Sequence, residues 1–144
     1  MPESVEIPRT IVVAGVILRD GKILVVKNVK KGVRIEPPGG KWEEEREESL
    51  EEAVVRELAE EVQVLVATRE FIGAYDTDSK EAEIVVHTFL CELLAGEPAI
   101  APAERDKLEE CFWATPDELE AMPTLTKSLR DTLPALRAII ARAA

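Results

Sequence analysis

The sequence contains few of the residues that mark zinc-binding, disulfide-rich or membrane proteins. Its 144 residues include two cysteines, Cys91 and Cys111, and a single histidine, His87, at spacings that match no zinc motif. No apolar run approaches the ~20 residues of a membrane span. Acidic residues occur within positions 1–6, where a secretory signal would be basic. We therefore expect a cytoplasmic protein whose two thiols are reduced.

Basic residues are well outnumbered by acidic ones. The chain has 18 Lys and Arg against 29 Asp and Glu, a formal net charge of −11. An extended nucleic-acid surface needs clustered basic side chains and is not expected. A small phosphorylated ligand stays compatible with this charge, because a bound metal ion supplies positive charge locally. With 46% hydrophobic and 33% charged residues the composition is globular, and the length predicts one domain over 1–144.

Hydrophobic periodicity predicts strands in the first two thirds of the chain, with one helix in the middle and two at the end. Asp20 and Gly21 form a hairpin turn signal, and residues 37–40 are expected to be a loop. Pro134 is expected to kink or divide the last helix. This order predicts a mixed α/β fold. The expected strands are 10–18, 23–26, 33–35, 64–75, 83–94 and 111–114, the expected helices are 49–62, 116–122 and 125–142, and polar connections are expected at 76–80 and 96–106.

The most distinctive segment is acidic, with ten Glu and two Arg between Glu43 and Glu61. Ser49 and Glu52 match a capping box, so a helix is expected to begin there. Its apolar face, at about 100° of rotation per residue, comprises Leu50, Val54, Leu58 and Val62.

Two glutamates of this helix, Glu57 and Glu61, fall inside or beside the apolar face, and Glu60 falls at its flank. Buried carboxylates repel each other and need a compensating charge. Arg56 is expected to point to the other side of the helix, away from Glu57 and Glu61. A divalent cation, Mg²⁺ or Mn²⁺, is then the better candidate, and it would suit a metal-bridged phosphorylated substrate. The competing interpretation is a solvated acidic face in a structural or interaction protein.

The same segment resembles the Nudix motif. Residues 56–61, RELAEE, match every specified position of its second half, and Glu48 stands eight residues before Arg56 as the motif requires. Seven residues separate Gly40 from Glu48 where the motif has five, and Gln63 stands in place of its final glycine. That glycine suits a left-handed helix end, so Gln63 is expected to cost ~1 kcal/mol or to change the exit from the helix.

The resemblance implies a Nudix-like α/β/α sandwich with a mixed sheet, and it also implies roles for individual residues. Glu48 and Arg56 pair and brace the loop against the helix, and the Gly40 carbonyl joins carboxylates in the metal shell. The basic residues beside the glycine loop are candidates for touching phosphate. The expected catalytic residues are Glu48, Arg56, Glu57 and Glu60, the expected metal ligands are Gly40, Glu57, Glu60 and Glu61, the expected substrate ligands are Lys41 and Arg34, and the general base is sought among Glu57, Glu60, Glu104, Glu109 and Glu110.

The implied activity is metal-dependent hydrolysis of a nucleoside diphosphate linked to another group. The region 79–82 carries neither the proline typical of ADP-ribose hydrolases nor the tyrosine typical of dinucleoside-polyphosphate hydrolases. This favours a MutT-like pyrophosphohydrolase of nucleoside triphosphates. The alternatives are an ADP-ribose or nucleotide-sugar pyrophosphatase and a catalytically weak nucleotide-binding or regulatory domain of the same fold. A small-molecule nucleotide is the expected partner, and a homodimer is compatible with the sequence.

Overall fold

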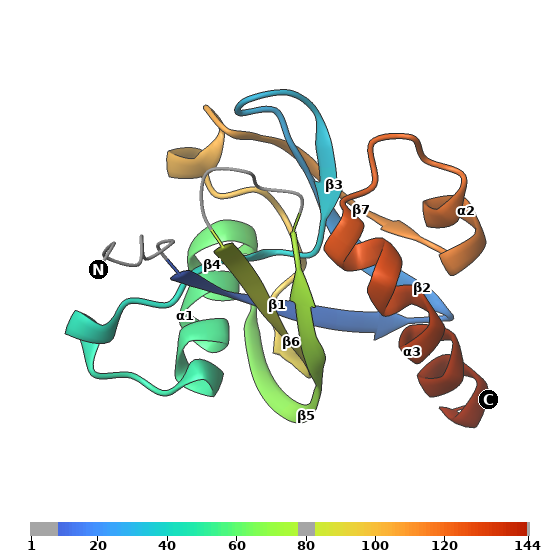
Figure 1. The fold of residues 1–144 in the computed structure, drawn as a ribbon, viewed down its shortest axis with the longest axis horizontal. Helices are drawn as coiled ribbons and strands as arrows, with labels where there is room; N and C mark the ends of the chain where they lie inside the picture. The colour runs from blue at the N-terminus through green and yellow to red at the C-terminus, as the bar shows by residue number, and fades with distance from the viewer. Residues whose placement is uncertain (1–8, 78–82, 144) are drawn as a thin grey trace, which may run out of the picture.

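The computed structural model describes residues 9–77 and 83–143. The acidic N-terminal segment 1–6, residues 78–80 of the expected polar connection and the substrate-signature region 79–82 lie outside the described residues. The elements, in chain order, are β1 (Arg9–Arg19), β2 (Lys22–Asn28), β3 (Arg34–Glu36), β4 (Gly39–Lys41), the 3₁₀ turn η1 (Glu44–Arg46), α1 (Leu50–Val62), β5 (Leu65–Asp76), β6 (Glu83–Ala95), the 3₁₀ turn η2 (Pro102–Glu104), β7 (Leu108–Ala114), α2 (Pro116–Glu120) and α3 (Lys127–Ala143) (Figure 1).

The strands form one mixed sheet built around β1. The main order is β3-β2-β1-β6-β5, with β4 added to β1 and β7 added to β2, seven strands in all. β1 and β6 run parallel over their whole pairing, while the other pairs are antiparallel. The mixed α/β fold predicted from the sequence is therefore confirmed. The 37–40 segment is only partly the loop that was expected, because Gly39 and Gly40 pair with β1 as strand β4.

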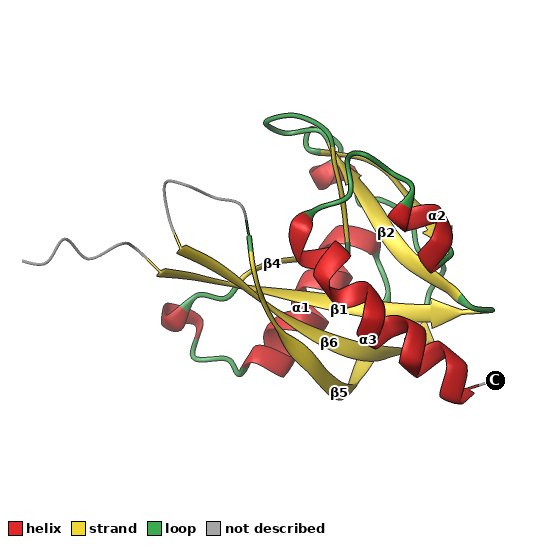
Figure 2. Cartoon of the chain, turned by 45° about the vertical axis from the view of Figure 1, so that its right-hand side comes forward, coloured by secondary structure: helices red, strands yellow, loops and turns green. Residues whose placement is uncertain are grey.

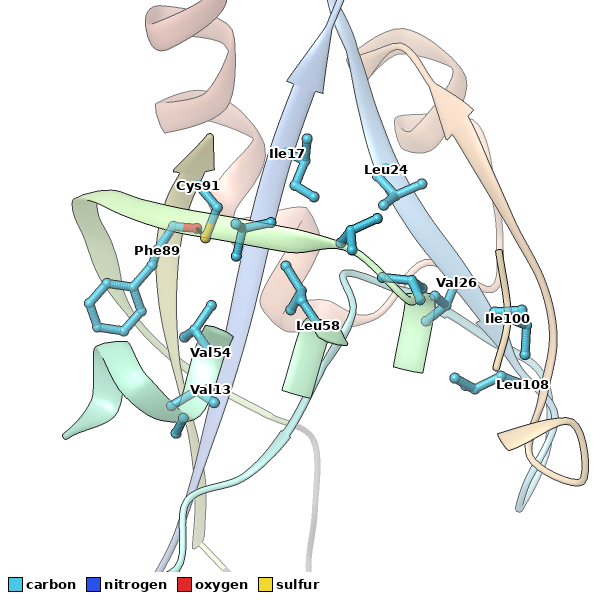
Figure 3. Close-up of a cluster of buried hydrophobic side chains, with 14 residues drawn as sticks. Val13, Ile17, Leu24, Val26, Val54, Leu58, Phe89, Cys91, Ile100 and Leu108 are labelled. Carbon is cyan, nitrogen blue, oxygen red and sulfur yellow. Dashed lines mark hydrogen bonds between the residues drawn. The ribbon is translucent and has the colours of Figure 1, made fainter. Parts of the chain in front are cut away.

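Helices cover both faces of the sheet, with α1 on one side and α3 on the other (Figures 1 and 2). Alternate residues of β2 supply the two cores, since Leu24 and Val26 face α1 whereas Ile23 and Val25 face α3. Figure 3 shows the α1 side, where Leu58 packs among strand side chains. This arrangement is an α/β/α sandwich, and it fixes one edge of α1 against the β1–β4 pair.

Two local predictions can be checked directly. Asp20 and Gly21 both have positive φ, 52° and 74°, as a tight hairpin turn between β1 and β2 requires. Pro134 does not divide the last helix, since α3 runs unbroken through it. Leu133 and Leu136, on either side of the proline, are buried in the same core and keep both halves of α3 on the sheet.

Candidate functional site

The N-terminus of α1 is fixed by the predicted capping box. Ser49 Oγ accepts a hydrogen bond from the Glu52 backbone N–H at 3.1 Å, and Glu52 Oε1 accepts one from the Ser49 N–H at 2.9 Å. Two of the backbone N–H groups that a helix start leaves without a helical acceptor are thereby satisfied. The phase of the helix, and with it the direction of each glutamate, follows from this start.

The C-terminus of α1 ends at Gln63, which adopts the left-handed conformation with φ of 60° and ψ of 38°. The glycine of the motif is therefore replaced without a change of exit. The Gln63 side chain also donates from Nε2 to the carbonyls of Ala99 and Ile100, at 3.1 and 3.4 Å. These bonds, which a glycine lacks, tie the helix end to the 96–106 connection.

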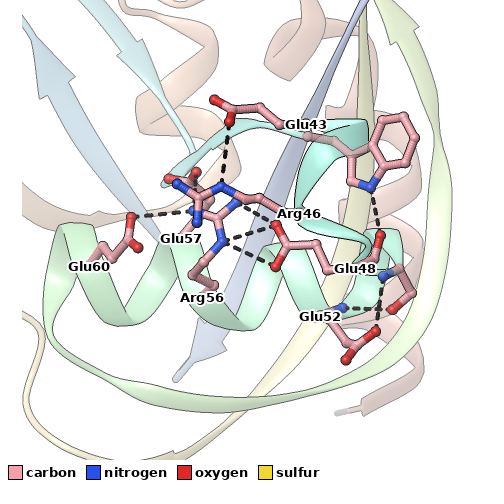
Figure 4. Close-up of polar contacts among 9 residues, drawn as sticks. Glu43, Arg46, Glu48, Glu52, Arg56, Glu57 and Glu60 are labelled. Atoms are coloured by element: carbon pink, nitrogen blue, oxygen red, sulfur yellow. Dashed lines mark hydrogen bonds and ion pairs between the residues drawn. The ribbon is translucent and has the colours of Figure 1, made fainter.

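Arg56 is the centre of an ion-pair network on α1 (Figure 4). Its Nε and Nη2 donate to the Glu48 carboxylate at 2.6 to 3.1 Å, which is the implied Glu48–Arg56 pair. Its Nη1 donates to Glu57 at 2.9 Å and more weakly to Glu60 at 3.4 Å. The hydrogen bonds from Arg56 hold the pKa of Glu48 below its ordinary value.

The contact with Glu57 corrects the sequence-based expectation that Arg56 points away from it. A helical wheel gives only the direction of the Cβ atom. The arginine side chain is long, so its guanidinium group can reach residues on a neighbouring face of the helix. Arg56 thus bonds Glu48 and Glu57 together and leaves Glu61 to other partners.

The loop between β4 and α1 contains the two extra residues and is held from both ends. Trp42 Nε1 donates to the Glu48 carbonyl at 2.8 Å, and Arg46 Nε lies 3.5 Å from Glu43 Oε2. The segment folds into η1, and Glu47 closes it in the left-handed region with φ of 52°. The insertion is therefore absorbed before Glu48, which still reaches Arg56.

Gly40 provides the space that Glu57 occupies. A Cβ atom added at Gly40 would lie 2.4 Å from Glu57 Oε2, much closer than any real contact allows. Burial is the largest influence on Glu57 and raises its pKa, although Arg56 opposes it. The Glu57 carboxylate lies against the backbone of β4, the short strand that pairs with the central strand β1.

Glu61 is the most buried carboxylate of the helix, with 5% of its surface exposed. Its Oε1 accepts a hydrogen bond from the Gly39 N–H at 2.8 Å, and Lys107 Nζ lies 3.9 Å from its Oε2. Burial raises the pKa of Glu61 to about 8, against the smaller opposing effects of these two partners. Its charge is therefore poorly compensated by the protein alone, which is the environment that a divalent cation relieves.

Glu60 lies apart from the other two, with half of its side chain exposed and its Oε2 at 3.4 Å from Arg56 Nη1. Within residues 9–77 and 83–143, no three acidic, histidine or cysteine side chains converge as a ready metal cluster. Glu57 and Glu61, which extend from α1 to the Gly39–Gly40 strand, are the carboxylates that fit a hard cation in chemistry and position. Cys91 and Cys111 are unpaired, as expected, and burial raises the pKa of Cys91 to about 12.

Two adjoining cavities lie on the β4 side of α1, and Glu61 lines the smaller of them. The smaller, about 330 Å³, is lined by Gly39, Gly40, Glu61 and Lys107 among others, and the larger, about 790 Å³, extends toward the start of α3. Arg34 and Lys41, the expected substrate ligands, line both.

Glu36 also lines both cavities, and sequence patterns did not single it out. Its Oε1 is buried without a hydrogen bond and lies 3.6 Å from Arg34 Nη2. Burial raises the pKa of Glu36. A buried carboxyl oxygen with an unused acceptor therefore lies where the two cavities meet.

Of the three later glutamates considered as general base, Glu104 is the one that the fold brings to this corner. Its Oε2 lies 3.0 Å from Lys107 Nζ, which in turn faces Glu61. Glu109 pairs with Lys27 at 3.2 Å, and Glu110 is exposed on β7. Lys107 was not predicted from the sequence, because no sequence pattern distinguishes a single lysine in a binding site from a lysine on the solvated surface.

The chain matches the family model described as NUDIX domain over residues 8–136. A curated relative, a "MutT-like protein" from Streptomyces ambofaciens, is 34% identical over 110 residues. That match covers 74% of this chain and 64% of the relative, so the chain spans somewhat less than two thirds of the relative's length.

Solved structures agree with this assignment. A MutT protein from Methanosarcina mazei superimposes with a TM-score of 0.80 at 22% identity, covering 94% of this chain and 97% of that one. A MutT NUDIX hydrolase from Burkholderia pseudomallei gives 0.73 at 27% identity, covering 88% and 96%. No helix in the described part of the chain is long and apolar enough to cross a membrane. The motif, the fold and these similarities together show that the chain belongs to the Nudix family.

Proposed function

We propose that this protein hydrolyses a diphosphate linkage in a nucleoside diphosphate derivative, with Mg²⁺ as cofactor and Mn²⁺ as a substitute. The observation that carries the proposal is the pair of α1 carboxylates on β4. Glu57 fills the space above Gly40, and Glu61 accepts from the Gly39 N–H. Gly39, Gly40 and Glu61 line a cavity that basic side chains also line. A purely solvated acidic face would leave these carboxylates in water.

The residues that would hold the cation are Glu57, Glu60 and Glu61, with the Gly40 carbonyl. A bound divalent cation shields the charge of the diphosphate and lowers the pKa of a coordinated water. Glu60, whose half-exposed carboxylate bonds Arg56 only at 3.4 Å, would have to turn away from that arginine to contribute. Arg56 positions Glu57 by a direct hydrogen bond, and its bonds to Glu48 fix that arginine in turn.

The remaining site residues bind substrate or move protons. Arg34 and Lys41 line both cavities and are placed to contact phosphate oxygens. Glu104 is the best-placed general base among the later glutamates, because it is the one beside Lys107 and Glu61. The larger cavity has room for the nucleoside, and the unbonded Glu36 oxygen offers an acceptor to its N–H or hydroxyl groups.

The specific substrate we propose is a nucleoside or deoxynucleoside triphosphate, cleaved as by a MutT-like pyrophosphohydrolase. Support comes from the absence of the ADP-ribose and dinucleoside-polyphosphate signatures in the sequence and from the similarity to a MutT-like protein. ADP-ribose or a nucleotide sugar is the alternative substrate class.

The test is phosphate or pyrophosphate release from a panel of dNTPs, NTPs, oxidised dGTP, ADP-ribose, NADH and a dinucleoside polyphosphate, with and without Mg²⁺ or Mn²⁺. We expect metal-dependent release from a triphosphate, its loss in Glu57→Gln, and its retention in Glu51→Gln, an exposed carboxylate on the same helix. Turnover that survives in Glu57→Gln would contradict the assignment of this residue. Silence of the folded wild type across the panel would favour a binding domain.

A further inference from the structure

Lys107 places an ammonium group between the carboxyl groups of Glu61, a proposed metal ligand, and Glu104, the proposed general base. Its Nζ lies 3.0 Å from Glu104 Oε2 and 3.9 Å from Glu61 Oε2. Its backbone is held on both sides, since its carbonyl accepts from the Val29 N–H at 2.8 Å and its N–H donates to the Glu104 carbonyl at 3.1 Å. The side chain therefore starts from a fixed point and reaches into the smaller cavity.

This arrangement differs from an ordinary surface ion pair, whose net value is small because both partners stay in water. Lys27 and Glu109 on the neighbouring strands form such a pair, with 56% of the Glu109 side chain exposed. Lys107 instead faces Glu61, of whose side chain 6% is exposed, and the cavity wall of Gly39 and Gly40. The attraction between charges is stronger where water is excluded, so Lys107 affects how strongly Glu61 and Glu104 can attract a cation.

Resting on the function proposed above, we propose that Lys107 is a phosphate-binding residue that serves, beside Glu61, as the counter-ion of Glu104 until a divalent cation binds. A cation and an ammonium group cannot both occupy the space between the same carboxylates, because like charges at this distance repel. The lysine side chain is flexible, and its three donors turn readily to a new acceptor. Arg34 and Lys41 also line the smaller cavity, so the displaced ammonium group would remain among basic side chains that can bind phosphate there.

Two opposite effects follow for the loss of this charge. Without the competing ammonium group the corner binds a divalent cation more tightly, whereas the nucleotide loses one phosphate contact and binds more weakly. A lysine that only stabilised the fold would move neither quantity and would lower thermal stability alone.

The experiment measures Mn²⁺ binding by calorimetry in the absence of nucleotide, for the wild type, Lys107→Met, Lys107→Arg and the matched control Lys27→Met. We expect Lys107→Met to bind Mn²⁺ about tenfold more tightly, with the Arg variant and the Lys27 variant near the wild type. Steady-state kinetics on the triphosphate that the panel identifies should show KM raised about tenfold in Lys107→Met and kcat changed less than about threefold.

Equal Mn²⁺ affinity in Lys107→Met and the wild type would overturn this inference while leaving the proposed hydrolase intact. A wild type that binds no Mn²⁺ would instead overturn the metal-dependent function itself. A melting temperature measured on each variant identifies any variant that fails to fold. Lys107→Arg keeps the positive charge, so its nucleotide KM should stay near that of the wild type. A KM raised as far in Lys107→Arg as in Lys107→Met would overturn the inference.

Discussion

Replacing Glu61 with Gln should stabilise the metal-free protein, and the effect should depend on pH. Burial raises the pKa of Glu61 to about 8 in the folded state, from an ordinary value of 4.5. A carboxyl with these two pKa values lowers the free energy of unfolding by about 3 kcal/mol at pH 7 relative to pH 4. Glutamine carries no charge and still accepts the Gly39 N–H, so it avoids this cost.

The direction in which the free energy of unfolding changes with pH follows from proton binding by Glu61. Between pH 4.5 and 8 the folded state holds the Glu61 proton that the unfolded state has released, so stability is complete below this range and falls as pH rises through it. The Glu61→Gln variant should therefore match the wild type near pH 4.5 and exceed it by about 3 kcal/mol or more at pH 8. Carboxyls remote from Glu61 titrate equally in both proteins and cancel in the difference, whereas Glu57 and Glu104 interact with Glu61 directly.

Urea unfolding at pH 5 and pH 8 in EDTA measures this difference, with Glu51→Gln as the exposed control on the same helix. Adding Mg²⁺ at pH 8 should stabilise the wild type more than Glu61→Gln, because the cation compensates the buried carboxylate. A variant no more stable than the wild type at pH 8, or a gain that is the same at both pH values, would refute the reasoning.

Three further substitutions test the supports of the site. Gly40→Ala should displace the Glu57 carboxylate, whose Oε2 would lie 2.4 Å from the new Cβ, and should lower kcat about 100-fold and stability by about 1–3 kcal/mol, measured by kinetics and urea unfolding. Arg56→Lys keeps the charge but loses the forked bonds to Glu48 and Glu57, so kcat should fall about 10- to 100-fold with little change in the nucleotide KM. Gln63→Ala should lose its two side-chain bonds and keep the left-handed strain, for a loss of about 1–2 kcal/mol in thermal unfolding, whereas Gln63→Gly should stay within about 0.5 kcal/mol of the wild type because relief of strain offsets the lost bonds. An equal loss in both Gln63 variants would contradict that account.

Local features of the sequence predicted most of the elements and the burial of Glu57 and Glu61. The capping box at Ser49 sets the phase of α1, and once the phase is known the position of Glu61 on the apolar face follows. The turn at Asp20 and Gly21 is equally local, because it depends on the conformational preferences of those two residues. Each of these predictions uses interactions within a few residues.

Features that depend on distant partners were not accessible in the same way. The Gly39–Gly40 segment becomes a strand because β1 lies beside it, and nothing in its own residues favours pairing. Lys107 and Glu104 reach the helix through the pairing of β7 with β2. Side-chain length was the other source of error, since Arg56 bends back to Glu57 in a way that helix geometry alone does not reveal.

The parallel pairing of β1 with β6 has a consequence for how the protein is made. On the ribosome, β1 emerges long before β6, with which it pairs from Arg9–Glu83 to Ile17–Cys91. Until β6 has been synthesised, β1 has β2 and β4 on one side and an open edge on the other, and open strand edges invite pairing between chains. Co-translational folding therefore completes late, and chains arrested before β6 should be the aggregation-prone species that chaperones protect.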